Sequence, residues 1–220
     1  VKQNLDILRH AGLQVTKEEI DLCVPEKDIL EAEFLIKQLT PDISSPLITI
    51  HPGASWNAGY RCWPLENYIA LIKRVTKELQ LKVIIIGNRG DIETGKRILR
   101  EIESPAIISV MGKTTLAQMT AIIKLSNLFL GNDSGPLHIA LALKIPSVAI
   151  FGSTSPEQVI GPHERCVVIR KNLACSPCYV HQYDYRPDCK DFRCLNEITV
   201  DEAFNAVKKV LSDNFHEGIS

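Results

Sequence analysis

The chain of 220 residues carries 25 basic and 26 acidic side chains and a formal net charge of −1, so its composition gives no sign of a nucleic-acid surface or a polybasic membrane arm. Its length suits one complete α/β core with an appendage better than two equal domains. No apolar run reaches the roughly 18 residues that a membrane span needs, and the first residues do not resemble a signal peptide, so we expect a soluble protein.

Residues 1–45 contain two weak helical patterns around a proline-containing stretch, and we interpret this segment as a connector. The chain does not begin with Met and enters a helical pattern at once. We therefore expect that further residues precede it.

From Pro46 onward, short apolar runs alternate with amphipathic segments. The runs predict strands at 47–50, 82–87, 106–110, 128–130 and 147–151, and the segments predict helices at 65–79, 91–102, 116–125 and 136–143. Continuous apolar runs between helices indicate strands covered on both faces, hence an α/β, Rossmann-like parallel sheet. Such a sheet binds ligands at the carboxyl ends of its strands, which directs attention to the loops at 51–63, 87–91, 111–115, 131–136 and 152–156.

The first of these loops contains small residues, including Gly53 and Ala54, that allow backbone to approach a ligand closely. Arg61 in the same loop offers a fork of donors to a phosphate. The alternative is a turn with an exposed arginine.

The next two loops hold further candidates. Asp91 either holds ribose hydroxyls or caps the helix that follows. Thr114 and Thr115 lie in a loop that is not a phosphate-binding P-loop, because the four-residue spacer and the leading glycine of that motif are absent.

The loop at 131–136 leads from a strand into a helix, and Pro136 suits the first helical position because it has no N–H to leave unpaired. The exposed N–H groups of Ser134, Gly135 and Leu137 favour a phosphate at this helix start. Gly135 also has no Cβ that would block its approach.

Two charged or titratable residues flank this helix start. Asp133 would repel a diphosphate, so we expect its carboxylate to face hydroxyls, backbone N–H groups or a cation. His138, about one turn further on, can meet a phosphate oxygen. The alternative is that Asp133 or Ser134 caps the helix and that His138 is a core histidine.

The segment 172–196 holds four of the seven cysteines in a C-x2-C-x10-C-x4-C pattern. These residues are Cys175, Cys178, Cys189 and Cys194. The spacing permits a structural tetrahedral zinc site, although the second pair is wider than usual. An odd number of cysteines without a secretory signal disfavours a disulfide scaffold, and structural metal, free thiols and disulfides all stay open.

The last element is a predicted helix at 200–213 with an apolar stripe. Thr199 is its expected N-cap, and Glu202 three residues later completes a capping box.

Taken in order, several motifs resemble glycosyltransferase family 9, the bacterial ADP-heptose:lipopolysaccharide heptosyltransferases. They are HPGA at 51–54, RCWP at 61–64, the Gly87 loop, GNDSGPLH at 131–138 and FGSTSP at 151–156. The resemblance runs from about Pro46 to Leu211. Two departures are Arg61, where the family commonly has lysine, and a loop between Ala54 and Trp63 that is about one residue longer than usual.

The resemblance implies the C-terminal half of a two-domain GT-B enzyme that is inverting and needs no metal for catalysis. Residues 46–220 would bind the nucleotide sugar, and residues 1–45 would connect to an N-terminal acceptor domain that carries the catalytic base. The implied donor-binding residues are Gly53, Ala54, Arg61, Asp91, Thr114, Thr115, Asp133, Ser134, Gly135 and His138.

The implied function is transfer of heptose from ADP-L-glycero-D-manno-heptose to the inner core of lipopolysaccharide, at the cytoplasmic face of the inner membrane and without a cofactor. No catalytic base is identified in this chain, which alone is expected to be inactive. Two alternatives stay open: a related transferase with another sugar-nucleotide donor, and a non-catalytic nucleotide-binding module.

Overall fold

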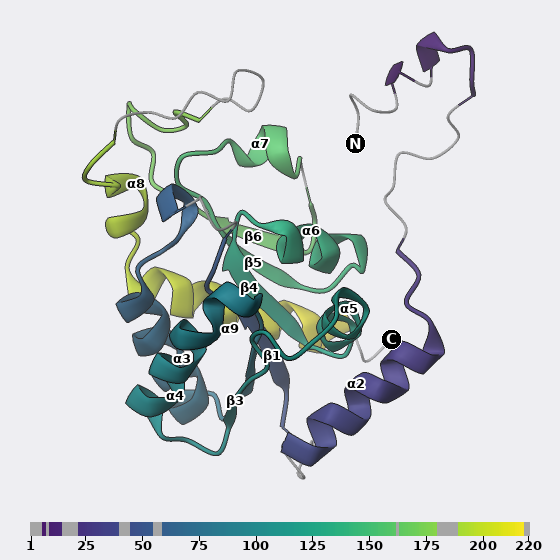
Figure 1. The fold of residues 1–220 in the computed structure, drawn as a ribbon. Helices are drawn as coiled ribbons and strands as arrows, with labels where there is room; N and C mark the ends of the chain where they lie inside the picture. The colour runs from purple at the N-terminus through teal and green to yellow at the C-terminus, as the bar shows by residue number, and fades with distance from the viewer. Residues whose placement is uncertain are drawn as a thin grey trace.

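The computed structural model describes residues 6–7, 9–14, 22–39, 45–54, 59–161, 163–179 and 189–217. These residues form a parallel sheet in the strand order β3-β2-β1-β4-β5-β6 (Figure 1). The strands are β1 Leu47–His51, β2 Lys82–Ile85, β3 Ile107–Ser109, β4 Leu128–Asn132, β5 Ser147–Ile150 and β6 Cys166–Ile169. The predicted Rossmann-like parallel sheet is confirmed.

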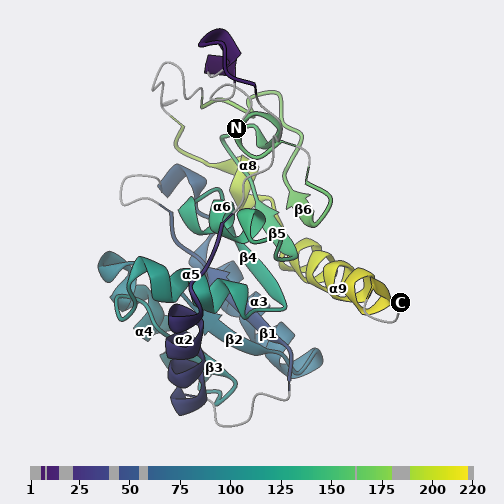
Figure 2. The ribbon, with the colours of Figure 1, turned by 90° about the vertical axis from the view of Figure 1, so that its right-hand side faces the viewer.

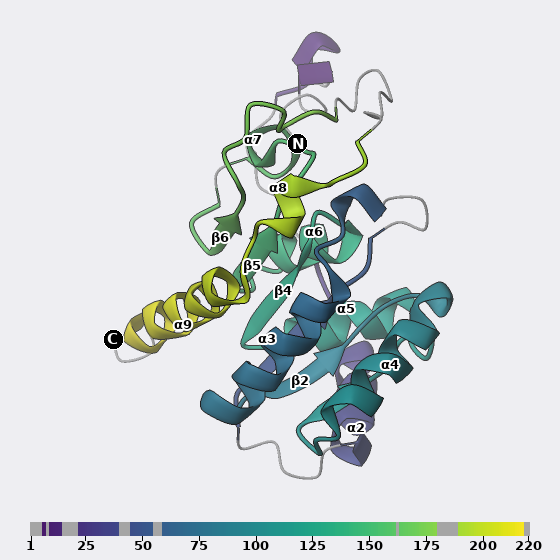
Figure 3. The same cartoon turned by 90° about the vertical axis from the view of Figure 1, so that its left-hand side faces the viewer.

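Helices cover both faces of this sheet. They are α2 Glu26–Leu39, α3 Leu65–Glu78, α4 Ile92–Ile102, α5 Leu116–Lys124, α6 Gly135–Ala142, α7 Pro156–Val159, α8 Arg193–Asn196 and α9 Val200–Glu217, with short 3-10 turns η1 Gly59–Arg61 and η2 Arg89–Asp91. Figure 3 shows α3, α4 and α9 on one face, and Figure 2 shows α2, α5 and α6 on the other. The long predicted helices are present, whereas α7 and α8 are too short to produce a periodic pattern in the sequence.

Each strand contributes to two hydrophobic cores because its side chains alternate between faces. On β1, Ile48 and Ile50 pack into the core under α3 and α9, while Leu47 packs into the core under α2 and α5. This double burial explains why the strands read as continuous apolar runs rather than as alternating patterns. β6 adds an edge strand in a region where the sequence shows only a weak pattern.

Helix α2 lies within the segment 1–45 that the sequence analysis assigns to a connector. Val24, Ala32 and Ile36 are buried in the same core as α5 and α6. This part of the connector is therefore packed on the sheet domain, and Leu30 and Phe34 point away from it, exposed. The division of the chain at residue 45 stays a prediction, and parts of the segments 1–45 and 172–196 lie outside the described residues.

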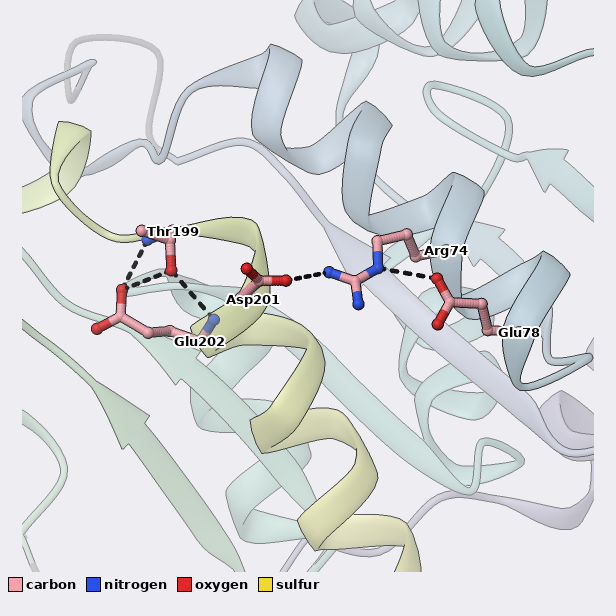
Figure 4. Close-up of polar contacts among 5 residues, drawn as sticks. All are labelled: Arg74, Glu78, Thr199, Asp201 and Glu202. Carbon is pink, nitrogen blue, oxygen red and sulfur yellow. Dashed lines mark hydrogen bonds and ion pairs between the residues drawn. The ribbon is translucent and has the colours of Figure 1, made fainter.

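The C-terminal helix begins with the predicted capping box (Figure 4). The backbone N–H of Thr199 donates to Glu202 Oε2 at 2.7 Å, and the backbone N–H of Glu202 donates to Thr199 Oγ1 at 3.2 Å. Arg74 of α3 ties this helix to the domain, because its Nη1 donates to Asp201 and its guanidinium lies 4.0 Å from the ring centre of Phe204. Across the described ranges, none of the helices combines the length and apolarity that a membrane crossing requires.

Candidate functional site

A pocket of about 340 Å³ opens at the carboxyl ends of β1, β2 and β4. The chain runs outward from β1 to β2 and β3 and then returns to β4 on the opposite side of β1. At such a switch point the loops on either side diverge and leave a crevice, which is where doubly wound sheets bind ligands. The pocket therefore lies where the sequence analysis expects a site.

The structure brings the predicted donor-binding residues to this one region. Those that line the pocket are Ala54, Thr114, Thr115, Ser134 and Gly135. Four others lie beside it: Gly53 and Asp133 are next to lining residues in the chain, Arg61 bonds Asp133, and Asp91 bonds the lining residue Asn88. His138 lies one turn into α6, where its backbone N–H donates to the carbonyl oxygen of Ser134 at 3.4 Å. Their contact with a donor stays a prediction.

One wall of the pocket is apolar, and the sequence analysis missed it. Leu116 and Met119 on the first turns of α5 line this wall, and Leu116 is 69% exposed. Thr115 caps the same helix, since its Oγ1 accepts from the backbone N–H of Gln118 at 3.2 Å. An exposed leucine beside polar groups suits a ligand with a flat apolar part, but a search for polar ligand-binding residues cannot find it.

Asp91 does not cap α4. Its Oδ2 accepts from the backbone N–H of Asn88 at 2.8 Å and closes the turn η2. A Cβ on Gly87 would lie 2.9 Å from Asp91 Oδ2, and a Cβ on Gly53 would lie 3.3 Å from Asp91 Oδ1. The Asp91 carboxylate thus fills the space that these two glycines leave at the pocket's edge, so the capping interpretation is wrong for α4.

Asn132 holds the two loops beside the pocket together, a role that its place in the motif did not reveal. It is fully buried at the end of β4. Its Oδ1 accepts from the backbone N–H of Trp63 at 3.0 Å and from Tyr68 Oη at 2.9 Å. Its Nδ2 donates to the carbonyl oxygens of Pro52 and Gly53 at 2.9 and 3.1 Å. The buried amide therefore makes four hydrogen bonds, three to the loop that follows β1 and one to Tyr68 of α3.

His51, the last residue of β1, lines the pocket and was not among the predicted site residues. Its Nδ1 lies 3.0 Å from Ser134 Oγ, and its side chain is almost completely buried. Burial lowers the pKa of His51 to about 4, although the nearby Asp91 carboxylate acts in the opposite direction. His51 is therefore neutral at neutral pH and positions the Ser134 hydroxyl.

This shifted pKa predicts acid sensitivity. His51 takes up a proton at the ordinary pKa of 6.5 in the unfolded chain but only at about 4 in the folded chain. The contribution of neutral His51 to the free energy of unfolding is therefore fully present above pH 6.5 and is lost as the pH falls from 6.5 to 4. Urea unfolding at pH 7 and pH 4.5 should show that His51→Gln loses about 2.5 kcal/mol less stability than the parent chain over this interval. Equal losses in the two proteins would show that His51 does not cause the sensitivity.

Arg61 and Asp133 form a partly buried ion pair at the side of the pocket. Arg61 Nη1 lies 3.4 Å from Asp133 Oδ2, and the same oxygen accepts from Thr154 Oγ1 at 2.9 Å. The carboxylate of Asp133 thus faces a hydroxyl and a cation, as expected, but both belong to the protein: the Thr154 hydroxyl and the Arg61 guanidinium. Arg61 Nε is buried without a hydrogen-bond partner in the described structure, so this guanidinium is only partly satisfied.

The N-cap residue of α6 makes no capping hydrogen bond with its side chain. Ser134 occupies the N-cap position, but its hydroxyl contacts His51 instead of a backbone N–H, and Asp133 bonds Thr154. The capping interpretation is therefore wrong for both residues. His138 is exposed rather than a core histidine, so the structural alternative for that residue is also wrong. The positive end of α6 faces the pocket through Gly135.

The four-cysteine cluster, which comprises Cys175, Cys178, Cys189 and Cys194, lies outside the pocket lining. The structure joins none of the seven cysteines in a disulfide. Within the described residues, no three His, Cys, Asp or Glu side chains form a ready-made metal cluster. The four-cysteine spacing seen in the sequence therefore does not correspond to a ready-made metal site among the described residues.

A family model and individual relatives of known function point to the same protein family. A sequence model of the family described as "Glycosyltransferase family 9 (heptosyltransferase)" matches residues 1–187. Lipopolysaccharide heptosyltransferase 2 of Escherichia coli is 28% identical over 164 residues, which cover 71% of this chain and 47% of that protein. The chain therefore spans about half the length of this relative.

Two solved structures share the fold. E. coli ADP-heptose lipopolysaccharide heptosyltransferase II is 27% identical with a TM-score of 0.70, over 88% of this chain and 54% of that one. A glycosyltransferase family 9 protein from Veillonella parvula has a TM-score of 0.77 at 19% identity, over 95% of this chain and 59% of that one. The second similarity concerns the fold alone.

Proposed function

The chain belongs to glycosyltransferase family 9, and from this premise we propose that it is the donor-binding part of an inverting heptosyltransferase. In this proposal residues 46–220 bind ADP-L-glycero-D-manno-heptose. Residues 1–45 connect to an N-terminal acceptor domain, and heptose is transferred to the inner core of lipopolysaccharide. The reaction takes place in the cytoplasm, at the inner face of the inner membrane.

The observation that carries the proposal is the pocket at the switch point of the sheet. The start of α6, which the side chain of Ser134 does not cap, lies on one side of it, and an apolar wall lies on the other. A diphosphate binds favourably at a helix start, where N–H groups and the helix dipole face it. The apolar surface of Leu116 and Met119 suits the flat face of a nucleotide base. The pocket thus has separate surfaces for the two chemically different parts of ADP.

The ion pair beside the pocket supports the same assignment. Asp133 neutralises Arg61 before the donor binds, and the unpartnered Nε of Arg61 gives this side chain a reason to reorient. When a diphosphate arrives, Arg61 can share its charge between Asp133 and a phosphate oxygen. Asp133 then positions Arg61 and does not act as the catalytic base.

In an inverting transfer, a general base removes the proton of the acceptor hydroxyl while donors stabilise the leaving ADP. The residues around the pocket suit the second task. We assign the base to the proposed N-terminal acceptor domain, so this chain by itself should bind donor without transferring heptose. The mechanism requires no metal or cofactor at the donor.

Calorimetry with ADP, UDP and GDP tests the donor class. We expect ADP to bind more tightly than UDP or GDP, and ADP-heptose to bind more tightly than ADP because its sugar adds contacts. A preference for UDP would contradict an ADP-sugar donor. Equal affinity for ADP and ADP-heptose would favour the alternatives, a different sugar or a nucleotide-binding module without catalysis.

A further inference from the structure

The loop that follows β5 holds both partners of the ion pair beside the pocket. Thr154 Oγ1 donates to Asp133 Oδ2 at 2.9 Å. Ser153 Oγ donates to the carbonyl oxygen of Tyr60 at 3.3 Å, and Tyr60 directly precedes Arg61 in the chain. Both hydroxyl side chains are buried. Two neighbouring residues of one loop therefore fix the aspartate by its side chain and the arginine by its backbone.

The segment that follows β6 is attached to the same loop. The backbone N–H groups of Cys178 and Tyr179 both donate to the carbonyl oxygen of Ser153 at 2.9 Å. Ser176 Oγ donates to the carbonyl oxygen of Gly152 at 2.6 Å. These three hydrogen bonds fix the backbone from which the side chain of Tyr179 extends.

The ring of Tyr179 contacts the ring of Tyr60. Their centres are 5.5 Å apart, with 37° between the ring planes, and both residues are half-buried. The Arg61 guanidinium carbon lies 5.6 Å from the centre of the Tyr60 ring, within the range of a cation–π interaction. Tyr179 therefore orients the aromatic ring beside which the Arg61 guanidinium lies.

The polar contacts of the Arg61 guanidinium define its direction only weakly. Its Nη1 lies at a long 3.4 Å from Asp133 Oδ2, and its Nε is buried without a hydrogen-bond partner among the described residues. Long hydrogen bonds constrain direction less than short ones do. The aromatic contact is thus a substantial part of what holds this side chain in place.

We propose that Tyr179 is a positioning residue for the donor, because through Tyr60 it orients the Arg61 guanidinium toward the diphosphate. The inference rests on the proposed function, in which Arg61 shares its charge between Asp133 and a phosphate oxygen. A guanidinium that is already oriented loses less conformational freedom when the phosphate binds. Tyr179 itself lies outside the pocket lining, so it acts on the donor only through Arg61.

Calorimetry with ADP and with adenosine, which has no phosphate, tests the proposal. Tyr179→Ala should weaken ADP binding by about 5-fold and leave adenosine binding unchanged, because only the phosphates meet Arg61. Tyr179→Phe keeps the ring and should bind ADP as the parent chain does. In an Arg61→Gln background, Tyr179→Ala should have no further effect on ADP affinity. Equal losses for ADP and adenosine, or an undiminished loss in the Arg61→Gln background, would overturn the proposal.

Hydrogen exchange of the Arg61 Nε proton, followed by ¹H–¹⁵N NMR, tests the positioning without any nucleotide. This nitrogen is buried, so Tyr179→Ala should speed its exchange with water by about 10-fold or more, while Tyr179→Phe should not. Equal exchange rates in Tyr179→Ala and the parent chain would overturn the proposal. If the parent chain binds no ADP but the exchange rates differ as expected, the proposed function fails and the positioning of Arg61 by Tyr179 stands.

Phe34→Ala is the matched control, because it also removes an aromatic ring, but Phe34 is exposed on α2 and lies outside the pocket lining. It should change neither the ADP affinity nor the exchange of the Arg61 proton. Tyr179→Leu keeps much of the apolar volume and guards against loss of the fold, and we expect it to weaken ADP binding as Tyr179→Ala does. Full ADP affinity in Tyr179→Leu would show that packing volume, and not the aromatic ring, is what matters.

Discussion

Replacing Asn132 by Ala is expected to lower the free energy of unfolding by about 4 kcal/mol. The substitution removes the hydrogen bonds of three buried partners, the Trp63 N–H, Tyr68 Oη and the Pro52 carbonyl, and of the half-buried Gly53 carbonyl. Each orphaned buried group costs about 1–3 kcal/mol, and relaxation or entering water recovers part of the sum. Urea unfolding followed by circular dichroism measures the loss.

Asn127→Ala is the matched control. Asn127 lies next to the start of the same strand, but it is exposed and its Oδ1 accepts a single hydrogen bond, from the backbone N–H of Leu47 at 2.8 Å. Its replacement should cost about 1 kcal/mol. Similar losses for the two variants would mean that Asn132 is not the tie between the loops. Where Asn132→Ala stays folded, its affinity for ADP should also fall, because the loop that carries Gly53 and Ala54 is released.

Placing a carboxylate at the start of α6 is expected to weaken donor binding strongly while sparing the fold. Gly135 is exposed, and a Cβ added there meets no atom within 4 Å, so Gly135→Asp fits without strain. An acidic residue in a first helical turn stabilises the helix, and we expect the free energy of unfolding to be unchanged or higher by up to about 1 kcal/mol. Repulsion of the diphosphate should weaken ADP binding by about 100-fold or more, about 2.7 kcal/mol.

Gly135→Asn separates charge from size, because the two side chains have nearly the same shape. The neutral variant should retain most of the ADP affinity of the parent chain. Calorimetry on both variants, with unfolding curves on the same samples, gives the comparison. Unchanged ADP affinity in Gly135→Asp would place the diphosphate elsewhere, and equal losses in the two variants would indicate a steric effect alone.

Much of the fold follows from local patterns in the sequence. Continuous apolar runs such as 47–50 and 128–130 are explained by burial on both faces of each strand, and this burial identifies the parallel sheet. The capping box of Thr199 and Glu202 was also predictable, because its two partners are only three residues apart in the chain. The position of the site was predictable as well, because parallel strands place their carboxyl ends at one edge.

The contacts that shape the site were not predictable in this way. Asn132 bonds Trp63 across 69 residues, His51 bonds Ser134 across 83, and Arg61 pairs with Asp133 across 72. A motif indicates that a polar residue is needed, but it does not say whether that residue faces a ligand or another loop.

The sequence by itself thus determined the α/β architecture and the loops that form the pocket, since both depend on hydrophobic periodicity and on neighbours in the chain. Only the tertiary structure decided that Asp133 faces Arg61, that Asp91 closes its own turn and that Leu116 forms an apolar wall. The physical reason is that a hydrogen bond or an ion pair depends on distance and direction. Those are set only when β1 and β4 lie side by side and bring remote loops together.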